Sequence, residues 1–207
     1  MIAGPDLAGT GLRIMGTCPA GPADGLAPAS HVVLLGPDEP DFWPVFRASP
    51  EAGDGCPDPL DRWSRRVIDA LAARHGALAI YPFDGPPFLP FQTFATRSGR
   101  CWPAPIRFLV HAEMGLWVSF RGALVVAEGP HLPAMDRPCD GCAAPCATAC
   151  PVDAFAAGYD VAACKAHINA PDGADCLARG CRARRACPVG AGLRLPEQAA
   201  FHMEAFR

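Results

Sequence analysis

Charged residues are scarce in this 207-residue chain, and lysine is almost missing. They make up 19% of the sequence, Lys165 is the single lysine among 18 basic residues, and the formal net charge is −3. The chain lacks the excess of basic charge that binding to a polyanion requires, so nucleic acid is not expected as the main partner. The hydrophobic fraction of 50% argues against wholesale disorder and predicts one or two compact units.

Long hydrophobic runs are also lacking. The longest apolar stretches, such as residues 122–127, are far too short to cross a bilayer. The first ten residues are broken by glycine and proline and lack the basic and apolar regions of an export signal. We therefore expect no membrane partner and a cytoplasmic location, where a reducing environment keeps thiols free.

Cysteine, in contrast, is abundant. The chain has eleven, an odd number that does not suit a closed set of disulfides. Cys18, Cys56 and Cys101 lie alone in the sequence and are interpreted as buried or incidental thiols. The other eight all fall between Cys139 and Cys187. They need an explanation other than disulfides.

The uneven distribution of cysteine predicts two domains. Residues 129–138 contain three prolines and a glycine and are interpreted as a linker. It would join an α/β domain over residues 1–128 to a cysteine-rich domain over 139–207 that ends in a C-terminal tail. Strands that alternate with helices in the first part favour a mixed α/β (α+β) layer fold.

Hydrophobic periodicity locates the elements of the first domain. The clearest helix spans residues 59–75, with Asp58 as its N-cap, Pro59 at its first position and Gly76 closing its end. The same pattern predicts short helices at 40–47 and 89–96 and strands at 31–36, 76–81, 106–111 and 116–127.

The densest cysteine segment reads Cys139-Asp-Gly-Cys142-Ala-Ala-Pro-Cys146-Ala-Thr-Ala-Cys150-Pro151. A [4Fe–4S] cube needs one thiolate on each of four irons, and three cysteines on a tight loop can wrap three of its corners. In two-cluster ferredoxins the fourth cysteine, before a proline, binds the second cluster. The spacing departs once from the bacterial pattern, because three residues separate Cys142 from Cys146. The extra residue predicts a wider turn at Pro145.

Four further cysteines bring the set to eight, which divides into two cubes without remainder. The crossed ferredoxin arrangement predicts that one cluster is bound by Cys139, Cys142, Cys146 and Cys187. It predicts that the other is bound by Cys150, Cys164, Cys176 and Cys181. Paired zinc sites would also use eight thiolates, but they favour pairs of CxxC knuckles, and only one CxxC occurs here. Two [4Fe–4S] clusters are therefore the preferred interpretation.

Four arginines surround the last predicted ligands: Arg179, Arg182, Arg184 and Arg185. Positive charge beside an anionic cluster would raise its reduction potential, because the reduced cube is more negative. A solvated basic helix face is the alternative.

Three parts of the chain resemble epoxyqueuosine reductases and their reductive dehalogenase relatives. They are Asp84-Gly-Pro-Pro-Phe-Leu89, Phe108-Leu-Val-His111-Ala-Glu-Met-Gly115-Leu-Trp117, and the cysteine region with its solitary Cys164. The first half is also similar to the cobalamin decyanase and trafficking chaperone of animals, through Asp58-Pro-Leu-Asp61 and residues 111–122. Residues 100–106 replace the reductases' Gly-Lys-Asn segment, and the helical repeats that read tRNA in many of them are missing.

The resemblance implies a nitroreductase-like first domain that binds cobalamin, followed by a dicluster ferredoxin-like module. By position, Asp84 would be the catalytic proton donor, since a buried carboxylic acid can protonate a reduced substrate. The turn implies His111, Gly115 and Trp117 as cofactor-binding residues. A turn or helix-cap role for Asp84, a satisfied strand-end histidine and a core tryptophan are the alternatives.

Three functions stay open at this stage. The first is a ferredoxin-like electron-transfer protein that serves a redox protein partner, with a ligand or corrinoid site in its first domain. The second is a cobalamin-dependent iron–sulfur oxidoreductase or corrinoid-processing enzyme. The third treats the clusters as structural staples of a partner-binding protein.

Overall fold

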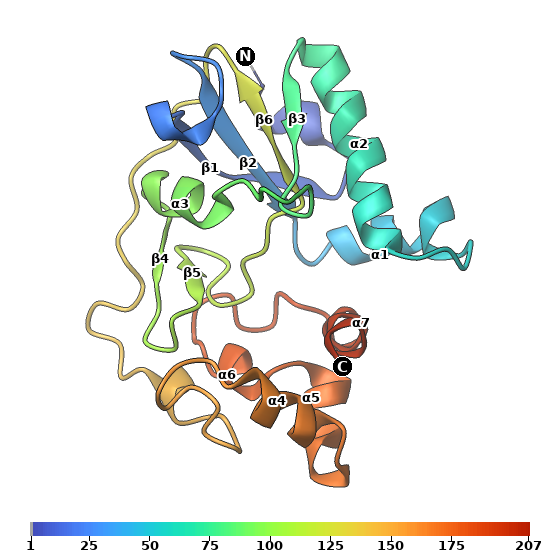
Figure 1. The fold of residues 1–207 in the computed structure, drawn as a ribbon, viewed down its shortest axis with the longest axis vertical. Coiled ribbons are helices and arrows are strands. Elements are labelled where there is room, and N and C mark those ends of the chain that lie inside the picture. The colour runs from blue at the N-terminus through green and yellow to red at the C-terminus, as the bar shows by residue number, and fades with distance from the viewer. Residues whose placement is uncertain (1) are drawn as a thin grey trace. The chain divides into compact units, whose positions relative to one another are not determined.

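The structure is a computed structural model that describes residues 2–207, apart from the side chain of Pro5. The chain forms two compact units. Unit 1 runs to Arg100 and resumes over Ser119–Met135, and unit 2 comprises Cys101–Val118 and Asp136–Arg207. Helices combine with small antiparallel sheets, so the fold is of the α+β class (Figure 1).

A four-stranded antiparallel sheet forms the centre of unit 1. Its strand order is β1 (Leu12–Pro19), β2 (His31–Pro37), β6 (Gly122–Val126) and β3 (Leu78–Ile80). Val32, Val33, Leu34 and Leu35 on β2 are all fully buried. Because successive side chains of a strand point to opposite faces, this run shows that both faces of the sheet are covered.

Three α-helices accompany this sheet: α1 (Phe42–Arg47), α2 (Pro59–His75) and α3 (Phe91–Arg97). Figure 1 shows α2 beside β3 and β6, which it contacts. The ring of Trp63 on α2 lies 5.3 Å from that of Phe42 and 6.0 Å from that of Phe46, both nearly edge-on. These aromatic side chains are buried and anchor α1 to α2.

The bounds predicted for the long helix are confirmed, but its cap works differently. The helix spans Pro59–His75, and Gly76 ends it in the left-handed conformation at φ +60°. Asp58 occupies the N-cap position at φ +51°, and its side chain makes no capping hydrogen bond. Its carbonyl oxygen instead accepts from the N–H groups of Asp61 and Arg62, at 3.1 and 3.0 Å.

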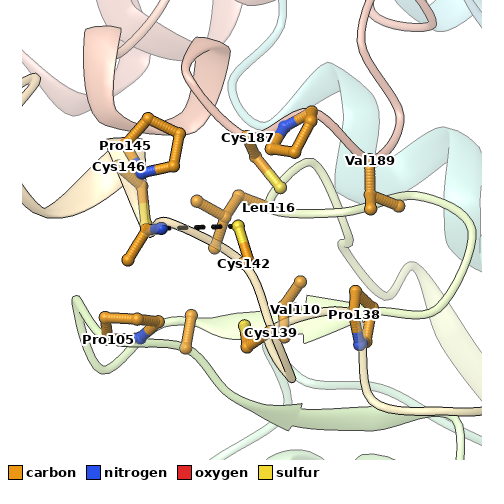
Figure 2. A pocket seen from close by; sticks show the side chains of 13 residues that line it. Pro105, Val110, Leu116, Pro138, Cys139, Cys142, Pro145, Cys146, Cys187 and Val189 are labelled. Carbon is orange, nitrogen blue, oxygen red and sulfur yellow. Dashed lines mark hydrogen bonds between the residues drawn. The ribbon is translucent and has the colours of Figure 1, made fainter.

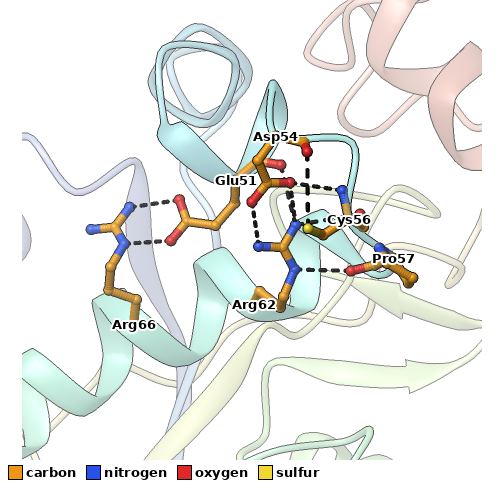
Figure 3. Close-up of polar contacts among 6 residues, drawn as sticks. All are labelled: Glu51, Asp54, Cys56, Pro57, Arg62 and Arg66. Carbon is orange, nitrogen blue, oxygen red and sulfur yellow. Dashed lines mark hydrogen bonds and ion pairs between the residues drawn. The ribbon is translucent and has the colours of Figure 1, made fainter.

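The loop before α2 is held by two carboxylate–guanidinium pairs (Figure 3). Both terminal nitrogens of Arg62 donate to the Asp54 carboxylate at 2.7 Å, and Arg66 donates to both oxygens of Glu51 at 2.5 and 3.0 Å. The bond from Arg66 holds the pKa of Glu51 at about 2. Cys56 is exposed on this loop.

The other predicted elements are present with shifted ends. The strands at 31–36 and 76–81 and the helices at 40–47 and 89–96 correspond to β2, β3, α1 and α3. The predicted strands at 106–111 and 116–127 shrink to β5 (Leu109–His111) and β6. β1 was not predicted, because a bulge between Ile14 and Gly16 breaks the alternation that marks a strand.

Unit 2 contains little regular structure. Its only sheet among the described residues is the hairpin of β4 (Cys101–Pro103) and β5. Its α-helices are α4 (Val161–Ile168), α5 (Ala174–Arg179), α6 (Arg182–Arg185) and α7 (Pro196–Phe206). Both units also contain short 3₁₀ turns: Gly4–Leu7, Pro22–Asp24 and Pro50–Ala52 in unit 1, and Pro145–Ala147 and Pro171–Gly173 in unit 2.

The boundary between the units differs from the predicted domain boundary. The prediction placed residues 101–118 in the first domain, whereas this segment belongs to unit 2. Ile106, Val110 and Leu116 pack in one buried cluster with Cys146 and Cys187. Local periodicity cannot reveal a core that joins segments so far apart in sequence.

The described residues contain no helix that is long and apolar enough to span a membrane.

Candidate metal centres

Four cysteines line one hollow in unit 2. They are Cys139, Cys142, Cys146 and Cys187, and Figure 2 shows the sulfurs of Cys142 and Cys187 directed into it. The rest of the lining is apolar: Ala104, Pro105, Val110, Leu116, Pro138, Ala144, Pro145, Pro188 and Val189. The empty space amounts to about 360 Å³, its open mouth included. We call this the first hollow.

The loop geometry explains how three of these cysteines reach the first hollow. Gly141 has φ +75°, and Ala144 adopts the left-handed conformation at φ +53° just before a 3₁₀ turn that begins at Pro145. The left-handed residue and the turn together accommodate the additional residue between Cys142 and Cys146. The turn also directs the N–H of Ala144 toward the sulfur of Cys142, at 3.4 Å.

Two facing glycines bring Cys187 to the first hollow. Gly115 has φ +56°, and a Cβ there would lie 2.0 Å from the carbonyl oxygen of Val189 and 3.1 Å from the sulfur of Cys187. Gly190 has φ +70°, and a Cβ there would lie 2.5 Å from the carbonyl oxygen of Met114. The two backbone segments therefore cross at a distance that only glycine permits.

The remaining four cysteines of the set line the second hollow: Cys150, Cys164, Cys176 and Cys181. They come from the end of the cysteine loop, from α4, from α5 and from the residue before α6. Asp160 starts α4 by accepting a hydrogen bond from the N–H of Ala163 at 2.9 Å. Phe155, His167, Ile168, Ala183 and Met203 are among the other lining residues.

The two sets of four thiols are the sets that the crossed ferredoxin pattern predicts. Cys150 leaves its neighbours on the loop and joins the second hollow, while the distant Cys187 joins the first. Ala183 and Phe155 line the second hollow and also pack in the buried cluster that contains Cys146 and Cys187. One packed cluster therefore connects the second hollow with two cysteines of the first.

Burial controls the electrostatics of these thiols. It raises the pKa of Cys139, Cys146, Cys176 and Cys181 above the ordinary value of a thiol. Bound metal reverses this effect, since a coordinating thiol is deprotonated. Backbone N–H groups support negative charge on sulfur, for example that of Ala154 at 3.4 Å from the sulfur of Cys150.

Three of the four predicted arginines converge on one carboxylate. Arg179 and Arg182 pair with Asp175 at 3.6 and 2.7 Å, and Arg185 donates to the same carboxylate. The bond from Arg182 is the main cause that lowers the pKa of Asp175. The single Asp175 carboxylate offsets one of these three positive charges.

Arg184 points elsewhere. Its guanidinium donates to the carbonyl oxygen of Leu116 at 2.9 Å and lies over the ring of Phe108, 4.9 Å from the ring centroid. Burial lowers the pKa of Arg184. This residue connects the segment after Cys181 to the turn that carries Gly115.

Among the described residues, no three His, Cys, Asp or Glu side chains form a group that could hold a single metal ion. All eleven cysteines are free thiols. A cube differs from a single ion, because each of its irons takes its own thiolate. Its four ligands therefore surround a volume and do not converge on one point.

The residues implied by the family resemblance occupy different surroundings. Asp84 in unit 1 has a side chain 48% exposed, and it accepts a hydrogen bond from Arg65. Asp84 is therefore not buried, as the acid of a proton donor would have to be. Its catalytic role stays a prediction.

The His111 turn of unit 2 is built around its histidine. His111 is fully buried, and its Nδ1 accepts from the N–H groups of Glu113 and Met114 at 3.0 and 3.2 Å. Trp117 is buried against Gly180 and lies under the guanidinium of Arg194. The core interpretation of Trp117 is confirmed, and contact of His111, Gly115 or Trp117 with a corrin stays a prediction.

Comparison of the chain with family models, with curated proteins and with solved structures gave no match. The features of the chain that bear on function are therefore the geometry of unit 2 and the chemistry of its donor set.

Sequence reasoning missed two residues that accompany the second set of cysteines, Tyr159 and His167. The hydroxyl of Tyr159 forms a hydrogen bond with the thiol of Cys164, and burial together with this bond raises the pKa of Tyr159. His167 lines the second hollow. Its position three residues after Cys164 on a helix was the available signal, because residues i and i+3 share a helix face.

Proposed function

We propose that the chain binds two [4Fe–4S] clusters in unit 2 and serves as a one-electron transfer protein. The observation that carries this proposal is the gathering of eight cysteines into two hollows of four in the crossed pattern. Cys150 follows the three loop cysteines of the first hollow but lines the second, and Cys187, 37 positions later, completes the first. A folded core without bound clusters would not need this crossing.

The walls of the hollows suit iron–sulfur clusters. Leu116, Val110 and Val189 give the first hollow an apolar wall, and Phe155 and Ile168 do so in the second. N–H groups near the sulfurs favour the negative charge of thiolate ligands, which is one of the means by which proteins set cluster potentials. When bound, such clusters accept and release single electrons.

The packing beside the hollows supports electron transfer over a purely structural role. Ala183 and Phe155 line the second hollow and belong to the packed cluster that contains Cys146 and Cys187, so packed side chains would connect the two clusters. We accordingly interpret unit 2 as a dicluster ferredoxin-like module enlarged by the β4–β5 hairpin and the turn over residues 111–118. The nitroreductase-like description of unit 1 and its corrinoid ligand remain predictions drawn from the resemblance.

Anaerobic reconstitution with iron and sulfide tests the proposal. We expect about eight irons and eight sulfides per chain, since each cube holds four of each. We also expect a visible absorbance that dithionite bleaches reversibly. Stoichiometric zinc in place of iron and sulfide, or cystine bridges, would contradict it.

Two further measurements distinguish electron transfer from a structural role of the clusters and from corrinoid-dependent catalysis. Clusters that bind but that dithionite cannot reduce would favour structural staples. Retention of hydroxocobalamin, with a shift of its spectrum, would favour a corrinoid-dependent reductase. The exposed Cys56 supplies the matched control, because Cys56→Ser should load as much iron as the unaltered chain.

A further inference from the structure

The two hollows differ in the side chains that face them. Apart from cysteine, the first hollow is lined only by alanine, valine, leucine and proline. The second adds two nitrogen-bearing side chains, His167 and Arg182. The Nε of Arg182 already donates to Asp175 at 2.7 Å, so this side chain has a partner. His167 is the residue whose role is unexplained.

The position of His167 is set by α4. Cys164 lies one helical turn before it on the same face, and the next residue, Ile168, is buried and lines the second hollow too. The Nε2 atom of His167 is buried and has no hydrogen-bond partner among the described residues. A buried polar nitrogen is costly unless it is paired, so this site calls for an acceptor in the hollow.

We propose that the Nε2–H group of His167 donates a hydrogen bond to a sulfur atom of the second cluster and raises its reduction potential above that of the first. This inference rests on the proposed function, since it requires that clusters bind. Reduction adds negative charge to a cube, so a hydrogen-bond donor stabilises the reduced form more than the oxidised form. The first hollow contains no side-chain nitrogen that could act in the same way.

At hydrogen-bond distance, one backbone N–H reaches a cysteine sulfur in each set: that of Ala144 on Cys142 and that of Ala154 on Cys150, both at 3.4 Å. The side-chain donor His167 is therefore what distinguishes the second hollow from the first. The difference in potential has a consequence for electron flow. An electron supplied by a one-electron donor would leave the first cluster oxidised and reduce the second.

A donor-deletion series tests the proposal. His167→Leu removes the donor, whereas His167→Gln keeps an N–H group at similar reach. Both are made in the Cys146→Ser chain, which should retain only the second cluster. In redox titrations followed by electron paramagnetic resonance, we expect His167→Leu to make reduction about tenfold less favourable, or about 59 mV for one electron. His167→Gln should restore most of this shift.

His202→Leu is the matched control, since His202 on α7 lines neither hollow and should leave the potential unchanged. Should His167→Leu fail to load iron, His167→Met takes its place, because methionine also lacks a donor and packs flexibly.

The outcomes separate the two proposals. If the unaltered chain binds no iron and sulfide, both fall. If it binds two clusters but His167→Leu leaves the second potential unmoved, or Leu and Gln shift it equally, the role of His167 is overturned and the proposed function stands. The same holds if the shift occurs in the Cys164→Ser chain, which should retain only the first cluster. If all three His167 variants lose iron, His167 has a structural role, and the proposal that it raises the reduction potential of the second cluster is likewise overturned.

Discussion

Unit 1 and unit 2 bury their interiors by different means. Unit 1 has a four-stranded sheet whose central strand is covered on both faces, with the rings of Phe42, Phe46 and Trp63 packed between its helices. Unit 2 has one two-stranded hairpin, four α-helices of four to eleven residues, and two hollows lined by thiols. A conventional hydrophobic core suffices for the first unit, whereas the second is arranged around the two hollows that the proposed clusters would fill.

The largest effect that separates the units is expected from iron removal. Metal-binding free energy becomes folding free energy where the ligands come from distant segments. Chelation of the loaded protein should therefore abolish amide-exchange protection over α4, α5 and α6 and leave β2 and β6 protected. Hydrogen exchange read by mass spectrometry makes this measurement. Equal loss in both units would show that they do not differ as described.

Truncation of the unit 1 core should have the next largest effect. Phe46 is fully buried, and Phe46→Ala should lower the free energy of unfolding of unit 1 by about 3–5 kcal/mol. Denaturant titration followed by tryptophan fluorescence measures it. Phe88→Ala is the control, because Phe88 is 65% exposed and should change stability by less than about 0.5 kcal/mol. Iron content should stay the same in both variants.

A glycine substitution can sharpen the comparison from the side of unit 2. Gly115→Ala places a methyl group against the carbonyl oxygen of Val189, so the segment with Cys187 must move. We expect about 1–3 kcal/mol of destabilisation from the strained backbone and loss of up to half of the bound iron. Gly192→Ala is matched, since Gly192 also has positive φ but faces open space. Full iron content in Gly115→Ala would contradict the crossing of the two segments.

The smallest effect concerns pH. Arg66 holds the pKa of Glu51 at about 2, below its ordinary 4.5, so this pair stabilises unit 1 above pH 4.5 and is lost as pH falls toward 2. Because the Arg66 side chain is 54% exposed, the contribution is at most about 1 kcal/mol. Glu51→Gln should remove it at pH 7 and flatten the acid dependence of unfolding. An unchanged acid profile in this variant would rule out the pair as its source.

Sequence patterns predicted some of this architecture well and some poorly, for physical reasons. The bounds of α2 follow from Pro59 and Gly76, because proline and glycine act on the backbone at their own positions. β1 and β4 were missed, since a bulge interrupts one and the other has only three residues. The segment 101–118 belongs to unit 2 and not to the unit in which the sequence pattern placed it, because its partners in the core follow some thirty or more residues later.

The candidate site shows the same division. The pool of eight thiols and the pattern of their crossing were accessible from the spacing of cysteine and from the Cys150-Pro151 and Cys187-Pro188 steps. The place of Asp84 in an ion pair with Arg65 could not be predicted, because the two residues are nineteen positions apart. The same holds for the approach of Gly115 to Val189.

The sequence by itself determined which donor atoms the chain offers, since the number, type and local spacing of cysteines are properties of the covalent chain. Tertiary structure alone decided that the hairpin at 101–111 joins unit 2, that Ala183 and Phe155 pack in one cluster with Cys146 and Cys187, and that His167 lines the second hollow. The reason is that side chains distant in sequence become neighbours only through packing, and local patterns contain no record of that packing.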